Sequence, residues 1–138
     1  MVPSARRERA GALAHPAAGW TLSAVAGLVS GVLGSFHQAW TARVGGVGLP
    51  VGAAVCLVVA LAVVVAAGRV TGSRVGALSA FVGWMVAVLV LTLPRPEGDL
   101  VVPGTPGGYL WLFGGTVLGA GALAWPYGQT VHVRRPAP

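Results

Sequence analysis

Four long apolar segments alternate with short polar stretches along the chain. The apolar segments cover residues 20–40, 47–67, 76–93 and 108–127, and no Asp, Glu, Arg or Lys lies within them. An α-helix rises about 1.5 Å per residue, so about 20 apolar residues cross the hydrocarbon core of a bilayer. Backbone polar groups in that core must bond within their own segment. Each segment is therefore predicted to be a transmembrane helix.

Aromatic residues at the ends of these segments fit the two membrane interfaces. Trp20 and Trp40 flank the first segment. Tyr109 and Trp111 near the start of the fourth segment, like Trp125 near its end, are interpreted as interfacial anchors.

Short connections between the segments indicate the fold. Residues 41–46 and 68–76 are too few to separate neighbouring helices widely, so consecutive helices are predicted to pack side by side and antiparallel. The expected fold is an all-α membrane protein, an antiparallel four-helix transmembrane bundle formed by residues 19–128. Residues 1–18 are predicted to be a basic N-terminal tail, and residues 129–138 a C-terminal tail. The 94–107 connection, rich in Pro and Gly, is the longest.

The charged residues exclude a soluble protein and set an expected orientation. Charged residues make up 9% of the chain, against about 25% in soluble domains. The net charge of +6 would suit nucleic acid in a soluble protein, but here the arginines lie in tails and loops, so we expect the lipid bilayer as partner and no nucleic acid. Seven arginines are predicted on one side of the membrane and two on the other. The seven are Arg6, Arg7, Arg9, Arg69, Arg74, Arg134 and Arg135, and the two are Arg43 and Arg95. The positive-inside rule then predicts both termini in the cytoplasm of a bacterium, with the chain in its inner (plasma) membrane.

Small residues recur at four-residue spacing in the apolar segments. Such residues line one face of a helix and allow another helix to approach closely. The candidate packing residues are Ser23, Gly27, Gly31 and Ser35 in the first segment, Gly48 and Gly52 in the second, and Gly115 and Gly119 in the fourth. Ser79, Gly83 and Ala87 continue the pattern in the third. Because the chain holds 22 glycines, isolated Gly pairs are weak evidence. The longer row in the first segment fits packing within the bundle or dimerisation, and we favour the former.

Residues with catalytic or ligand-binding chemistry are scarce. The absence of a charged residue within the spans argues against a proton-coupled exporter. Cys56, the single cysteine, is interpreted as a buried small hydrophobe. We expect no catalytic residue, cofactor or metal site.

One polar cluster is conceivable at the outer surface. His37 and Gln38 lie near the outer end of the first segment and could meet Arg95, Glu97 and Asp99 of the long connection. A histidine with two carboxylates suits a metal site or an acid–base pair. The favoured interpretation is simpler: His37 and Gln38 lie at the headgroup level, and the acids keep the loop soluble.

The stretch DLVVPGTPGGYLWLFGG at residues 99–115, followed by a fourth span and a basic tail, resembles a family of small four-span actinobacterial membrane proteins of unknown function. The resemblance implies topology and bacterial origin. It supplies no activity and no catalytic residue.

Two functions remain open at this point. The favoured one is non-enzymatic: an uncharacterised integral membrane protein acting as a structural or accessory subunit, which assembles with itself or with a larger membrane protein. Substitution of Gly27 and Gly31 by leucine is then expected to disrupt assembly. The alternative is a small transporter or channel-like protein for a neutral or apolar solute, which needs a hollow path between the helices.

Overall fold

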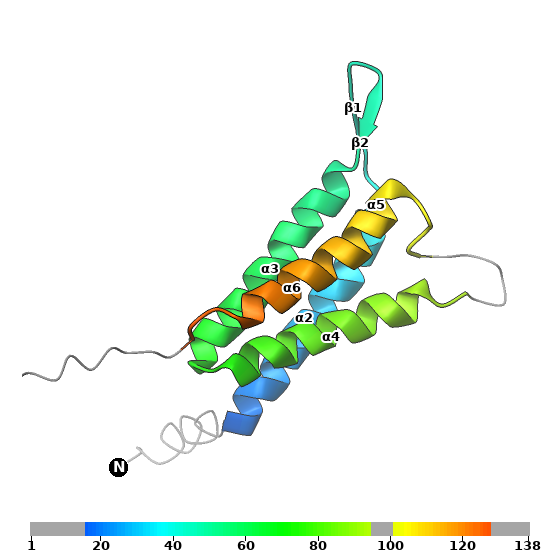
Figure 1. Ribbon diagram of the computed structural model, residues 1–138. Coiled ribbons are helices and arrows are strands. Elements are labelled where there is room, and N and C mark those ends of the chain that lie inside the picture. The colour runs from blue at the N-terminus through cyan, green and yellow to red at the C-terminus, as the bar shows by residue number, and fades with distance from the viewer. Residues whose placement is uncertain (1–15, 95–100, 128–138) are drawn as a thin grey trace, which may run out of the picture.

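The computed structural model describes residues 16–94 and 101–127, and this part of the chain is mostly helical (Figure 1). Its long helices are α2 (Pro16–His37), α3 (Val51–Thr71) and α4 (Arg74–Thr92). A two-stranded sheet, β1 (Ala42–Val44) and β2 (Val47–Leu49), lies between α2 and α3. The last helical region comprises α5 (Pro106–Tyr109), the π-helical segment η1 (Leu110–Gly114) and α6 (Gly115–Leu123).

The three long helices are each long and apolar enough to cross a membrane. Their exposed surface carries large apolar side chains, such as Leu33, Val58 and Phe36, each more than half exposed. Their contacts with one another are made mainly by alanine, glycine and serine. This arrangement reverses that of a soluble helical protein and is typical of helices packed in lipid, where close backbone approach replaces the hydrophobic effect.

A two-residue turn joins α3 to α4 and makes them antiparallel neighbours. Gly72 ends α3 in the left-handed conformation, with φ at 59°, and its N–H donates to the Arg69 carbonyl. Ser73 then begins α4, its hydroxyl accepting from the Gly76 N–H at 3.2 Å. Helical structure therefore extends through most of residues 68–76, which the sequence had indicated as a loop.

Substitution of Gly72 by alanine should lower the free energy of unfolding by about 1 kcal/mol, because a Cβ disfavours the left-handed conformation. The loss can be measured by SDS titration of the protein in detergent micelles. Gly72→Asn should lose less, since asparagine tolerates this conformation. Equal losses for both variants would show that the backbone conformation is not their cause.

A β-hairpin replaces the expected start of the second span. Gly45 and Gly46 both have positive φ, 59° and 85°, as a two-residue hairpin turn with the twist of paired strands requires. Ala42 pairs with Leu49 in the antiparallel register, and the hairpin projects beyond the helices in Figure 1. The predicted second span, residues 47–67, is thus corrected: residues 47–49 form β2, and α3 begins at Val51 after Pro50.

The other helix boundaries also differ from those expected. The first helix begins at Pro16, so residues 16–18 of the predicted tail are helical, and it ends at His37. The third helix begins two residues early, at Arg74. The fourth helical region begins at Pro106, after the Thr105 cap, and ends at Leu123. Its backbone stays helical where its segments join, with φ near −60° and ψ near −42° at Tyr109, Leu110 and Gly114.

The helices form a bundle with two distinguishable ends. The end that carries β1, β2 and α5 is called the hairpin end, and the end with the α3–α4 turn is called the turn end (Figure 1). Helix α4 packs against both α2 and α3, and α6 packs against α3 and α4.

Candidate functional site

The small-residue row of α2 lies against α4. A Cβ at Gly27 would overlap the carbonyl oxygen of Ala80, and a Cβ at Gly83 would overlap the carbonyl oxygen of Ala24. Gly31 lies against Ala87 and the Trp84 backbone in the same way. Backbone thus meets backbone along this contact, which we call the α2–α4 seam. The face of α2 that carries Gly27 and Gly31 is therefore covered by α4 of the same molecule.

Serines at the two ends of this row are also buried. The Ser23 hydroxyl donates to the Gly19 carbonyl and the Ser35 hydroxyl to the Gly31 carbonyl, each at 2.8 Å. These bonds to the preceding helical turn satisfy the donor of each hydroxyl within α2.

The other glycines predicted to pack helices have different neighbours. Gly52, at the start of α3, would place a Cβ 2.9 Å from the Trp40 carbonyl oxygen. Gly115 lies under the Trp84 ring and Gly119 under the Phe81 ring. Gly48 is the exception, because it lies in β2, is exposed, and has no atom within 4 Å of its added Cβ. Its predicted place in a helix interface is corrected accordingly.

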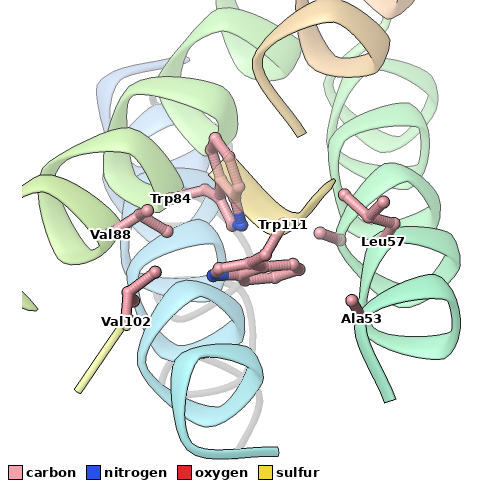
Figure 2. Packing of buried hydrophobic residues seen from close by; sticks show 7 residues of the cluster. Ala53, Leu57, Trp84, Val88, Val102 and Trp111 are labelled. Atoms are coloured by element: carbon pink, nitrogen blue, oxygen red, sulfur yellow. The ribbon is translucent and has the colours of Figure 1, made fainter. Parts of the chain in front are cut away.

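Two tryptophans fill the interior near the hairpin end. Trp111 is fully buried, its Nε1 donates to the Ser35 hydroxyl at 3.2 Å, and its ring covers Gly34. In Figure 2 this ring lies between Leu57 of α3 and Val88 of α4. The sequence had indicated Trp111 as an interfacial anchor, whereas Tyr109, two residues earlier, is exposed. Trp111 is instead the centre of the core.

Trp84 packs edge-on against Trp111. Their ring centroids are 5.3 Å apart at an interplanar angle of 75°, a favoured edge-to-face geometry. The nitrogen-bearing edge of Trp84 is turned toward the Trp111 ring (Figure 2). Trp84 Nε1 has no hydrogen-bond partner among the described residues, so the electron-rich face of Trp111 is its favourable neighbour.

Helices α2 and α3 leave a long hollow between them, in contrast to the α2–α4 seam. One cavity of about 460 Å³ is lined by Ala26, Ser30, His37, Cys56 and Val63, among others. A second cavity, of about 330 Å³, shares Ala26 and Val63 with the first and continues to Gly19 and Thr71 at the turn end. We call the two together the α2–α3 groove. Its walls are almost entirely apolar, and Cys56, predicted to be buried, is only half-buried on one of them.

Of the predicted outer polar cluster, the structure describes His37 and Gln38. His37 is exposed, with its Nδ1 2.8 Å from the Leu33 carbonyl oxygen. Gln38 is fully buried, which the headgroup-level interpretation did not anticipate. Arg95, Glu97 and Asp99 lie outside the described residues. Within residues 16–94 and 101–127, no three His, Cys, Asp or Glu side chains come together as they would around a metal ion.

Gln38 faces a small cavity at the hairpin end. This cavity has a volume of about 170 Å³ and lies between the end of α2, the base of the hairpin and the start of α5. Its lining residues are Gln38, Ala39, Thr41, Gly48, Pro50, Pro103, Thr105, Pro106 and Gly107. We call it the hairpin-end cavity.

Comparison with known proteins identifies a family. The model of a family described as a family of unknown function (DUF6113) matches residues 21–126. No curated protein and no solved structure matches the chain. Since the match covers well over half of the chain, the protein belongs to this family. The actinobacterial origin and the four-span plan implied by the resemblance at residues 99–115 stay predictions.

Proposed function

We propose that this member of the DUF6113 family is a non-enzymatic accessory subunit that holds a transmembrane helix of another protein molecule in its α2–α3 groove. The single observation that carries the proposal is a contrast between two parts of the structure. Tryptophan rings fill the interior of the bundle, whereas the α2–α3 groove is empty of side chains. Both features lie within the described part of the chain.

The filled interior weighs against the transporter alternative. Trp111 and Trp84 occupy the space between the helices. The cavity next to Trp84, lined also by Leu57 and Gly115, has a volume of only about 10 Å³, which is about the minimum that one water needs. A solute path between these helices would require both tryptophan rings to move.

The groove suits a helix better than a lipid chain. It follows α2 from Gly19 at one end to His37 at the other, a distance of roughly 27 Å at the helical rise. That length nearly matches the whole hydrocarbon core, whereas one acyl chain fills only one leaflet. Small residues such as Ala26 and Ser30 lie along the groove and would permit close helix approach.

The distribution of charge supports a four-span arrangement with both termini in the cytoplasm. Arg69 and Arg74 lie at the turn end, and Arg43 lies in the hairpin at the opposite end. The Arg69 guanidinium is 5.9 Å from the centre of the Trp125 ring, and tryptophan and arginine together are typical of an interface. The proposal therefore places the turn end in the cytoplasm of a bacterial inner membrane. The helical region from Pro106 to Leu123 would be the fourth span.

Photo-crosslinking in native membranes tests the proposal. A photoreactive amino acid at Ala26, which is exposed in the groove, should yield one adduct of defined protein mass. The same residue at Ala120, exposed on α6 outside the groove, is the matched control and should yield no such adduct. An adduct of twice the protein's own mass would identify the partner as a second copy.

The groove can also be closed by mutation. Ala26→Leu should abolish an adduct formed from a photoreactive group at Val63 on the opposite wall, while Ala120→Leu should leave it unchanged. If the groove positions yield lipid adducts alone, the accessory-subunit proposal fails.

A further inference from the structure

We propose that the hairpin-end cavity binds a small uncharged molecule that carries an amide-type group, with Gln38 as the residue that recognises it. This site is separate from the α2–α3 groove and does not depend on its function.

The state of the Gln38 side chain is the first observation. Gln38 is 0% exposed, and neither Oε1 nor Nε2 has a hydrogen-bond partner among the residues the structure describes. Burying a primary amide without partners is destabilising, and buried polar groups in folded proteins are nearly always paired. Ser23 and Ser35, the other buried polar side chains of α2, are both paired. The Gln38 amide therefore has unused hydrogen-bonding capacity for a partner that enters from the cavity.

The cavity beside this amide is the second observation. Its volume of about 170 Å³ is many times the space that one ordered water needs. Gly107 forms its wall next to the amide, because a Cβ added there would lie 3.4 Å from Gln38 Oε1. A methyl group at Gly107 would therefore lie in contact with the amide and reduce the space beside it.

The walls of the cavity are held in place before any ligand binds. Three of its residues, Pro50, Pro103 and Pro106, have a fixed φ. The Thr105 N–H donates to the Pro103 carbonyl at 2.8 Å, and the Thr105 hydroxyl accepts from the Gly108 N–H at 3.2 Å. Such a pre-formed site loses little conformational entropy on binding.

The lining selects the chemistry of the ligand. None of the nine lining residues is charged, so a charged ligand would lose its hydration without compensation. The Gln38 amide offers one acceptor, Oε1, and a donor, Nε2, side by side. A second amide group can satisfy both through a pair of hydrogen bonds. A carboxylate can pair only with Nε2 and would place its other oxygen against Oε1.

Side-chain amide NMR provides a direct test, because this chain contains two glutamines, Gln38 and Gln129, and no asparagine. Two side-chain amide pairs are therefore expected in the ¹H–¹⁵N spectrum of the full protein in micelles, and Gln129→Ala assigns them. Acetamide should shift the Gln38 pair saturably and leave the Gln129 pair unmoved. Acetate at the same concentrations should shift neither pair.

Variants of the cavity make the test specific. Gln38→Leu should weaken acetamide binding, read from the Gly107 backbone amide, by at least about tenfold, the equivalent of one lost hydrogen bond. Gly107→Ala, which narrows the space at Oε1, should also weaken it. Gly121→Ala is the matched control, because Gly121 lies in α6 outside the cavity and its added methyl meets no atom within 4 Å, and this variant should bind as the unmodified protein does.

Two results would overturn the proposal. One is an acetamide response that fails to saturate or that acetate reproduces. The other is a Gln38 amide that shows magnetisation exchange with water alone and no response to acetamide, which would identify the cavity as a water site. Gly107→Ala retains Gln38, so it decides the matter if Gln38→Leu does not fold.

Discussion

Gly27→Ala is expected to lower the free energy of unfolding by about 2–3 kcal/mol, at the upper end of the usual cost of overpacking. The added methyl would overlap the Ala80 carbonyl oxygen. That atom belongs to the α4 backbone and cannot rotate away as a side chain would. The two helices must therefore separate, and separation loses the close contacts that hold α2 to α4 in lipid. SDS titration in mixed micelles measures the loss.

Gly121→Ala is the matched control for this prediction. Gly121 is also a helical glycine, but it is exposed and no atom lies within 4 Å of an added Cβ. Alanine there should be neutral or slightly stabilising, because it has the higher helix propensity. A similar loss at Gly27 and Gly121 would mean that the α2–α4 seam is not tightly packed.

Gly83→Ala probes the same seam from the other helix. Its methyl would overlap the Ala24 carbonyl oxygen, so a loss of similar size is expected. The double variant Gly27→Ala/Gly83→Ala should lose less than the sum of the two, because one methyl already separates the helices. A fully additive loss would contradict a shared seam.

Hydropathy alone predicted the helical regions of this protein but not all of their limits. The valines at 44 and 47, with Leu49, are as apolar as those of α3, and a short apolar run does not distinguish a strand from the start of a helix. The signal for the hairpin was present in the Gly45–Gly46 pair and in Pro50. Hydropathy alone places the glycine pair in the 41–46 connection and Pro50 in the second apolar segment.

The small-residue row predicted a close helix contact but not its partner. Four-residue spacing places Ser23, Gly27 and Gly31 on one face, yet which helix covers that face depends on the whole bundle. The same limit applies to Trp111, whose position near a segment end suits an interface equally well. Its burial follows from the bare backbone at Gly34, 77 positions earlier in the chain.

The burial of Gln38 and the two cavities were beyond prediction from the sequence. Gln38 is covered because residues 103–107 fold back over the end of α2, a contact between distant segments. The α2–α3 groove lies where residues of the two helices, such as Ala26 and Val63, leave space between them. Neither cavity has a periodic pattern in the sequence.

Trp111→Ala is expected to lower the free energy of unfolding by about 3–5 kcal/mol, the range for removing a large buried aromatic side chain. The ring is fully buried and contacts Trp84 and Leu57. Its loss would leave a cavity opposite Gly34, which carries no side chain to fill it. Trp125→Ala is the control: Trp125 is 54% exposed, and losing its contact with Arg69 should cost at most about 1 kcal/mol.

Because the Trp111 ring lies against Gly34, the effect of Gly34→Ala on the free energy of unfolding should change sign when Trp111 is replaced by alanine. In the unmodified protein Gly34→Ala should be destabilising, because its methyl would overlap the Trp111 ring. In the Trp111→Ala background the same methyl enters the new cavity and should be stabilising, with about 0.5–1 kcal/mol from the buried methyl group added to the gain in helix propensity. Thermal and SDS unfolding of the four proteins measure this coupling. Because Gly34 is also a helical glycine, the gain in helix propensity acts equally in both backgrounds, and only direct contact between the two positions reverses the sign.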